Sequence, residues 1–312
     1  TAFAGWDDVV PMTTAEVAVH ESFAPWADHR AFMETVFARA YERAAAAIHA
    51  IDPGARLSTS GTRPSYPYSA CDWWQILPHL DHLMPYPRLY DQGEVQRSFA
   101  RLPTMTCSGF GATGAFQKYM IWYSALHGSS AVIFSKVTTC ISADLSVYPD
   151  QRLRTAEMRD LQDGLGKALM SARRLHDGVA VHYSPASIRA EWISSFVSGR
   201  RTGYESALAR DRRGWLRALE ALGLQYEFVS GDQIAGDELI HKKWKVLVMP
   251  HSQAVSDSEA DGVERFVKQG GTLVGTYRTG TLDAHCAVRG AGALDDVFGV
   301  SRRDRAPSYD DT

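Results

Sequence analysis

The chain has few cysteines, and they lack the spacing of a metal site. The four residues are Cys71, Cys107, Cys140 and Cys286, and no two of them form a CxxC or CxxxC pair. Zinc sites and the disulfide frameworks of small secreted domains use cysteines at short, regular spacings. We therefore predict reduced, partly buried thiols and neither a metal nor another cofactor.

Long apolar runs and a basic stripe are also missing. Because no run reaches the roughly 18 apolar residues that a membrane-spanning helix needs, we predict no membrane partner. The net charge is −3, with 33 basic and 36 acidic residues interspersed, so we predict no nucleic-acid partner. The 312 residues are enough for two domains, and their composition is 45% hydrophobic and 22% charged. This composition is typical of a soluble globular protein, and we favour a cytoplasmic location.

The second part of the chain, from Asp177 to Phe298, alternates predicted strands with predicted helices. The strands are predicted over 177–184, 226–229, 245–249 and 272–277, and the helices over 213–222 and 256–268. Such alternation is typical of a parallel sheet that helices cover on both faces.

A long connection is predicted inside this module, over 188–212. It carries Trp192, Phe196 and Tyr204. Long loops in compact α/β units are commonly functional, so we predict that this segment covers a subunit contact or the rim of an active site.

The strand ends of the module carry little that is typical of catalysis. The sequence Pro250-His-Ser-Gln follows one strand and Arg278-Thr-Gly follows another. Neither end has a Gly-x-Ser-x-Gly elbow, a Gly-x-Gly-x-x-Gly loop or a cysteine on a strand-to-helix turn. No acidic residue has a spacing that would make His251 and Ser252 part of a triad, so we interpret them as a polar loop end. The module is predicted to hold an assembly together.

The first part of the chain also alternates strands and helices. Strands are predicted over 56–60, 81–85, 104–108 and 131–135, and helices over 27–50, 70–80, 94–100, 116–126 and 152–174. This pattern predicts the second half of a (β/α)₈ barrel. Four strands cannot close a barrel, so we expect the first half upstream of Thr1. The predicted domains are 1–176 and 177–312.

Several segments together resemble one enzyme family. They are Val179-Ala-Val-His-Tyr-Ser, Trp215-Leu-Arg-Ala-Leu-Glu-Ala-Leu-Gly-Leu, Lys245-Val-Leu-Val-Met-Pro, Val255-Ser-Asp-Ser-Glu-Ala, Phe266-Val-Lys-Gln-Gly-Gly and Leu294-Asp-Asp-Val-Phe-Gly-Val. More loosely, the segment Thr1-Ala-Phe-Ala-Gly-Trp-Asp-Asp-Val-Val-Pro looks like the one that follows the fourth barrel strand in that family. The family is glycoside hydrolase family 42, the β-galactosidases with a TIM barrel and a trimerisation domain.

This resemblance implies a fold and a partner set. The fold would be a partial (β/α)₈ TIM barrel, strands five to eight, followed by a flavodoxin-like, class I glutamine amidotransferase-like α/β domain. The partners would be a carbohydrate substrate, a β-galactoside or related oligosaccharide, and two further copies of the chain in a homotrimer.

The carboxyl groups of the chain depart from the pattern of the family. Retaining glycosidases need two carboxyl groups about 5–5.5 Å apart. The resemblance places the acid/base glutamate before Thr1 and the nucleophile at the end of the seventh strand. Here that strand, 104–108, and the 109–114 segment after it contain no carboxylate. Two alternatives follow: an enzyme with a stand-in nucleophile, inactive as these 312 residues alone, or a non-catalytic carbohydrate-binding or assembly homologue.

Three acidic residues are candidates for the missing role. Glu94 follows the sixth strand and is the candidate nucleophile; the alternative is a first-turn helix glutamate. Asp144 follows the eighth strand, where the family places a substrate-contacting acid; the alternative is a loop or capping aspartate. Glu21 lies in a predicted loop, where a solvated role is favoured.

Aromatic residues crowd the first part of the chain. Sugar rings present apolar faces that stack on aromatic planes. Trp6, Tyr86 and Phe110 lie at predicted strand ends, so we predict that they bind substrate. Arg63 follows the fifth strand, where it could donate hydrogen bonds to sugar hydroxyls or pair with a surface acid. Helical patterns place three further tryptophans in the core: Trp73, Trp74 and Trp122.

Overall fold

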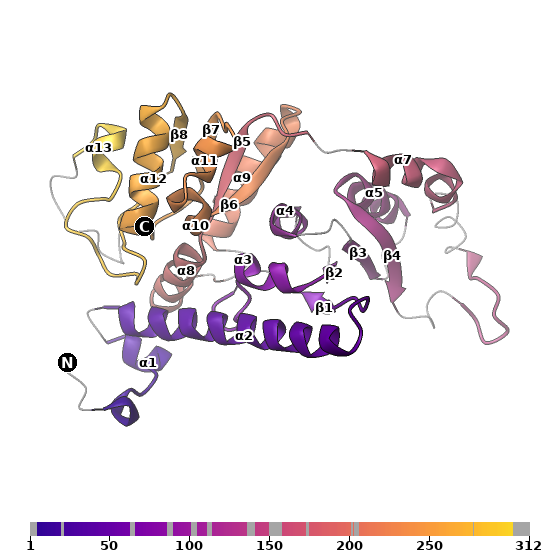
Figure 1. The fold of residues 1–312 in the computed structure, drawn as a ribbon, viewed down its shortest axis with the longest axis horizontal. Coiled ribbons are helices and arrows are strands. Elements are labelled where there is room, and N and C mark those ends of the chain that lie inside the picture. Colours follow the sequence, from indigo (N-terminus) through magenta and orange to yellow (C-terminus); the bar gives the residue numbers. More distant parts are fainter. Residues whose placement is uncertain are drawn as a thin grey trace. The chain divides into compact units, whose positions relative to one another are not determined.

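The structure is a computed structural model of the chain, and its elements are labelled in Figure 1. It describes residues 5–19, 22–62, 66–85, 90–100, 105–110, 114–135, 141–149, 158–172, 175–200, 202, 206–276 and 278–301. Two compact units form. Unit 1 comprises Thr1–Ala38, Ser65–Asp72 and His176–Thr312, and unit 2 comprises Arg39–Pro64 and Trp73–Leu175. The predicted domains, 1–176 and 177–312, divide the chain at a different place and stay a prediction.

Unit 2 contains a parallel sheet in the order β1-β2-β3-β4. Its strands are β1 (Ser58–Thr62), β2 (His82–Pro85), β3 (Met105–Phe110) and β4 (Ser129–Ser135). Each strand overlaps a predicted one. The connecting helices are α3 (Trp73–Ile76), the 3₁₀ turn η2 (Leu77–His79), α4 (Tyr90–Phe99) and α5 (Gly114–Leu126). Consecutive strands are therefore neighbours, joined by helical crossovers.

Two predicted helices of unit 2 are shorter than expected. The helix predicted over 70–80 begins only at Trp73 and continues as a 3₁₀ turn with a proline near its start, because Pro78 has no amide to donate within an α-helix. The predicted last helix is described from residue 158, as the π-helical η4 (Leu161–Leu165) and α7 (Gly166–Ser171). A backbone φ of 153° at Gly164, inside η4, breaks the regular helix.

The longest helix is α2 (Ala24–Ile51), which begins three residues before its predicted start. Figure 1 shows it as one continuous helix. Its carboxy-terminal half belongs to unit 2, where the Tyr41 hydroxyl lies 2.8 Å from that of Thr59 in β1. The chain then turns at Asp52-Pro53-Gly54.

Unit 1 contains the second parallel sheet, in the order β6-β5-β7-β8. Its strands are β5 (Val179–Tyr183), β6 (Tyr226–Ser230), β7 (Val246–Met249) and β8 (Thr272–Gly275). Strand β5 is buried along its whole length, which explains why it begins with three consecutive apolar residues, Val179-Ala-Val. Its helices are η1 (Trp6–Asp8), α1 (Thr14–Val17), α8 (Pro185–Val197), α9 (Ala207–Ala221), α10 (Gly231–Ala235), α11 (Glu238–His241), α12 (Asp257–Lys268) and α13 (Asp295–Phe298).

Serine residues fix where the helices of this module begin. Ser184, Ser206, Ser230 and Ser256 each accept a hydrogen bond from the third residue of the helix that follows. A serine at this position satisfies one of the amides that the first turn leaves unpaired. The true start of α9 is therefore Ala207, six residues before the predicted one.

Helix α8 corrects the prediction of a long connection over 188–212. Residues 185–197 are helical, and α9 begins at residue 207. Eight of the 13 residues of α8 are buried, including Arg189, Glu191 and Trp192. Because buried side chains surround this helix, it has no polar face and hence no helical period that the sequence could reveal.

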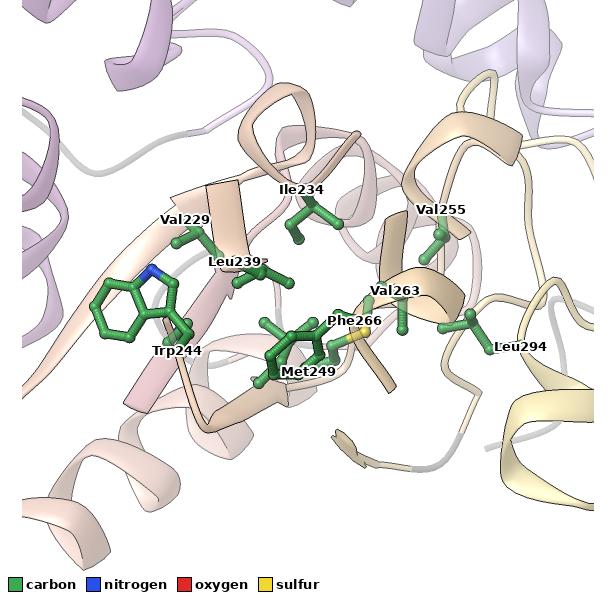
Figure 2. Close-up of a cluster of buried hydrophobic side chains, with 11 residues drawn as sticks. Val229, Ile234, Leu239, Trp244, Met249, Val255, Val263, Phe266 and Leu294 are labelled. Atoms are coloured by element: carbon green, nitrogen blue, oxygen red, sulfur yellow. The ribbon is translucent and has the colours of Figure 1, made fainter. Parts of the chain in front are cut away.

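The core of unit 1 fills the space between one face of the sheet and the helices that follow β6 (Figure 2). Ala180, Val229, Leu247 and Met249 alternate with residues of the opposite face along their strands. They pack against α10, α11 and α12, which contribute Ile234, Leu239, Val263 and Phe266. At Gly262 a Cβ atom would lie 2.2 Å from the Ile234 carbonyl oxygen, so only glycine permits this approach of α12 to α10.

A buried ion pair joins α2 to α8 within unit 1. Arg189 donates to the Glu34 carboxylate, and both side chains are almost fully buried. Burial raises the pKa of Glu34 to about 7; the charge of Arg189 opposes this shift and that of Asp72 adds to it. Burial raises the pKa of the Cys71 and Cys286 thiols, and the charge of Glu34 adds to this shift. Both are free cysteines.

None of the helices in the described part of the chain combines the length and the apolar composition needed to cross a bilayer.

We expect Leu247→Ala to lower the free energy of unfolding of the module by about 2–5 kcal/mol, because it leaves a cavity in a packed core. Leu222→Ala is the matched control, since that side chain is 73% exposed and should change stability by less than about 0.5 kcal/mol. Urea denaturation followed by circular dichroism measures both. Equal stabilities of the two variants would contradict this account of the core.

The raised pKa of Glu34 predicts a pH dependence of stability. Its folded-state pKa, about 7, lies above the usual 4.5, so its contribution to stability is complete below pH 4.5 and is lost as the pH rises through 7. We expect the free energy of unfolding to fall by on the order of 2 kcal/mol from pH 5 to pH 8 because of this group. Glu34→Gln should remove that part of the slope, whereas Glu264→Gln, at an exposed ion pair, should retain it. The same slope in both variants would refute the prediction.

Candidate functional site

The residues predicted to bind substrate are described only in part. Arg63, Tyr86 and Glu21 lie outside the described residues. The backbone of Trp6 lies in η1, and that of Phe110 ends β3. The roles of these residues therefore stay predictions.

Glu94 is the fifth residue of α4 and does not lie in a strand-end loop. The carboxylate is 1% exposed. One oxygen accepts from Arg97 at 2.7 Å, and the other pairs with Nδ1 of His127. The imidazole of His127 in turn stacks on Tyr123, with ring centroids 3.9 Å apart. Both oxygens are thus bound to basic side chains, which is the arrangement of a buried ion pair. The proposed nucleophilic role requires one oxygen to face a sugar carbon, and it stays a prediction.

Asp144 lies at the tip of a short exposed loop. Ile141 and Val147 pair across this loop as an antiparallel bridge. The carboxylate accepts from the backbone amide of Ser146 at 2.9 Å and from the hydroxyl of Ser142. Hydrogen bonds from Ser142 and Ser146 lower the pKa of Asp144 to about 2. This is the geometry of an aspartate that shapes its own turn; its exposure leaves contact with a sugar as a prediction.

A Ser-His-Glu arrangement lies at the strand ends of the module, and the sequence analysis missed it. In β5, His182 lies with Nδ1 3.0 Å from the hydroxyl of Ser252 and with Nε2 3.2 Å from the carboxylate of Glu259. Because the partners are 70 and 77 residues away in the chain, no local motif could reveal them. Residue types and connectivity match those of a hydrolytic triad.

Because its side chains are buried, this arrangement has a structural role and not a catalytic one. Ser252 is 1% exposed, so its oxygen has no access to a substrate. The second oxygen of Glu259 accepts from the Ser256 amide at 2.6 Å, which caps α12. Burial raises the pKa of Glu259, but His182 and Ser256 outweigh this effect, so that its pKa lies below the usual value. The network ties together β5, α12 and the loop after β7.

That loop also fills the position where doubly wound α/β folds bind ligands. This position lies outside the carboxyl ends of the strands, where the chain order switches direction, here between β5 and β7. The hydroxyls of Ser184 and Ser187 both donate to the Ala254 carbonyl oxygen at 3.2 Å, and the Ala254 amide donates back to Ser187 at 3.0 Å. Ala254 is fully buried. The backbone of Ala254 therefore occupies the place at the start of α8 where a ligand would bind in such folds.

His251 has an acidic partner that its spacing did not reveal, which corrects the sequence analysis. Its Nε2 lies 3.1 Å from the carboxylate of Glu191 in α8, which also accepts from Gln253 at 3.1 Å. Although burial alone raises the pKa of Glu191, the hydrogen bond and charge of His251 bring it below the usual value. A φ of 46° at His251 is strained for a residue with a side chain, and a 2.7 Å bond from its amide to Thr276 holds it.

Two histidine–carboxylate pairs thus fasten the strand ends of the module. Each carboxylate is buried and already accepts several hydrogen bonds. These hydrogen bonds hold the loops rigid. Among the described residues of the loops, no exposed pair of acids remains.

Residues 178–311 match the model of the β-galactosidase trimerisation domain. No curated protein matches the chain.

Solved structures match over almost the whole chain. Gan42B, a GH42 β-galactosidase from G. stearothermophilus, has a TM-score of 0.75 at 15% identity, covering 99% of this chain and 50% of its own. A β-galactosidase from Bacillus circulans sp. alkalophilus has a TM-score of 0.72 at 19% identity, with 97% and 48% covered. An exo-carrageenase GH42 from Bacteroides ovatus has a TM-score of 0.59 at 15% identity, with 90% and 47% covered.

The chain spans about half the length of the solved structures it matches. It has an α/β fold with parallel sheets like those of glycoside hydrolase family 42 β-galactosidases, and its carboxy-terminal module is similar to the β-galactosidase trimerisation domain.

Proposed function

We propose that the chain is part of a glycoside hydrolase of the β-galactosidase type, acting on β-galactosides or related oligosaccharides. The observation that carries this proposal is the match of residues 178–311 to the trimerisation domain. The fold agrees with it, since the GH42 β-galactosidase Gan42B aligns with 99% of the chain.

We further propose that the sheet of unit 2 is strands five to eight of a TIM barrel. Its strands are parallel and follow one another in the order β1-β2-β3-β4. Neighbouring strands of such a barrel are also consecutive in the chain and joined by helices. The module would then be the flavodoxin-like α/β domain, and 1–176 and 177–312 would be the two domains.

The active site would lie at the carboxyl ends of the barrel strands. The strand ends of the trimerisation module cannot supply it, because Glu191 and Glu259 are engaged in buried networks. At least one carboxylate would therefore come from the barrel half. Asp144 follows β4, where it would contact the sugar, and Glu94 is the candidate nucleophile.

The alternative to an enzyme is a non-catalytic homologue that binds carbohydrate or serves assembly. The pairing of Glu94 with Arg97 and His127 supports it, because a nucleophile needs a free oxygen. Measurement of turnover separates the two functions.

We expect the protein, expressed as it occurs in its open reading frame, to hydrolyse aryl β-galactosides. If Glu94 is the nucleophile, Glu94→Ala should lower kcat by several orders of magnitude, because the covalent route cannot proceed without it. Glu220→Ala, in α9 of the other unit, is the control. Steady-state kinetics on a panel of aryl glycosides checks this prediction.

Two outcomes would redirect the proposal. Activity within about threefold in Glu94→Ala, or roughly 0.7 kcal/mol in the barrier, excludes Glu94 as nucleophile and leaves it as part of an ion pair. The absence of turnover on every glycoside, with sugar binding retained, favours the non-catalytic alternative.

We also propose a homotrimer, in which α8 and the segment that follows it would cover a subunit contact or the rim of the active site. The match to a trimerisation domain supports this assembly. Light scattering should give three times the mass of one chain at micromolar concentration. A single-chain mass under those conditions would contradict the proposal.

A further inference from the structure

Helix α2 lacks the preceding strand that the other connecting helices of the first sheet have. The helical segments α3 with η2, α4 and α5 each lie between two strands that are neighbours in the sheet. Helix α2 likewise leads into a strand, β1, after the turn at residues 52–54. The described residues before α2 form only η1 and α1, and none of them is in a strand. Helix α2 is thus the second part of a strand–helix–strand unit whose first strand is missing from the described sheet.

Strand β1 has a free edge. It pairs in parallel with β2, Ser58 with His82 and Thr59 with Leu83, and with no other strand in the described part of the chain. The free edge of a strand presents a row of backbone N–H and C=O groups to which another strand can add. Parallel sheets are extended by strand–helix–strand units. The edge of β1 can therefore accept one more parallel strand.

Helix α2 also has an exposed apolar face, which we call the open face. Its members recur at steps of three or four residues, so they share one side of the helix. They are exposed residues Met33, Val36, Ala40, Ala44, Ala47 and Ile51. Three of the side chains are large: Met33, Val36 and Ile51 are 36%, 39% and 89% exposed. A continuous row of exposed apolar side chains is typical of a surface that another element covers.

The open face is not the side of α2 that packs on the sheet. On the packed side Ala45 is buried, and the Tyr41 hydroxyl lies 2.8 Å from that of Thr59 in β1. A third side carries the charged residues Arg39 and Glu42, which are exposed. A helix that packs on one neighbour has one apolar side and is polar elsewhere. Two apolar sides are typical of a helix that lies between a sheet and a second helix.

We propose that a segment of the same polypeptide preceding Thr1 covers these two surfaces. Its strand pairs in parallel with the free edge of β1, and the helix before that strand packs along the open face of α2. Consecutive strands are neighbours in this sheet, so the strand before α2 belongs beside β1 and the preceding connecting helix beside α2. Gan42B has room for such a segment, since it aligns with 99% of this chain over only 50% of its own length.

A second copy of the chain fits the free edge less well than a segment of the same polypeptide. Two copies related by a twofold axis present the same surface to each other, so their β1 strands would run antiparallel. The strands of this sheet are all parallel. A preceding strand of the same polypeptide continues the sheet without a change of direction.

The rate of thiol labelling tests the proposal on the protein expressed as it occurs in its open reading frame. Ala47 lies on the open face, whereas its neighbour Ala46 is exposed on another side of α2. We expect Ala47→Cys to react with a maleimide at least about tenfold more slowly than the matched control Ala46→Cys, because a covered side chain reacts only after local opening. Mass spectrometry of the modified peptides separates each introduced thiol from the four native cysteines. Equal labelling rates overturn the inference.

A charge on the open face tests which molecule covers it. Ala47→Glu should lower the melting temperature of the same protein, because it buries a carboxylate without a partner. Ala46→Glu makes the same change in helix propensity at a solvated position and should leave the melting temperature nearly unchanged. An Ala47→Glu variant that keeps its circular dichroism spectrum and melting temperature but loses oligomer mass in light scattering overturns the inference. It would identify the open face as a contact between copies.

These outcomes are separate from those that test the proposed function. Slow labelling of Ala47→Cys in a protein that hydrolyses no glycoside keeps the open face as a contact within one polypeptide and removes the enzymatic proposal. Hydrolysis by a protein in which Ala47→Cys and Ala46→Cys react equally fast does the reverse.

Discussion

The packing of α2 on α8 is the constraint on which unit 1 depends. Two buried contacts make it: the ion pair of Glu34 with Arg189 and the parallel stack of Trp26 on Trp192. The Glu34 carboxyl accepts from the buried Arg189 guanidinium, and a buried cation without such a partner costs several kcal/mol. This packing explains why the first half of α2 clusters with the carboxy-terminal module and not with the residues that follow it in the chain.

Inside the module, polar networks take the place that ligands occupy in related architectures. Hydrogen bonds to His182 and Glu191 hold the loop after β7 in place. Ala254 of this loop accepts a hydrogen bond at the start of α8. Fully hydrogen-bonded buried networks specify one arrangement of the chain. The module is thereby rigid at its strand ends, which suits a role in assembly better than a catalytic one.

Among the solved structures that resemble this chain, the fold does not determine the substrate. Solved structures that share the fold include β-galactosidases and an exo-carrageenase, so the scaffold alone does not select a sugar. Selection must come from side chains on the scaffold.

The sequence alone determined the elements with a clear local pattern. The amphipathic helices α2 and α12 could be predicted because side chains on one face of a helix repeat every 3.6 residues. Strands β5 and β7 could be predicted because strands buried on both faces are short and mainly apolar. The resemblance to family 42 followed from the same segments. For the site, the sequence pointed to aromatic residues and to few acidic ones. Glu94 and Asp144 were chosen because each follows a predicted strand along the chain.

Only the tertiary structure decided how the polar residues pair. Helix α8 could not be predicted because it is buried on nearly all sides and so has no polar face. His182 meets Ser252 and Glu259, and Glu191 meets His251, across 60 to 77 residues. Trp192 contacts Trp26 only because two helices that are distant in the chain pack together. Local periodicity reports whether a residue faces a core, whereas the choice of partner depends on packing between elements, which no local pattern encodes.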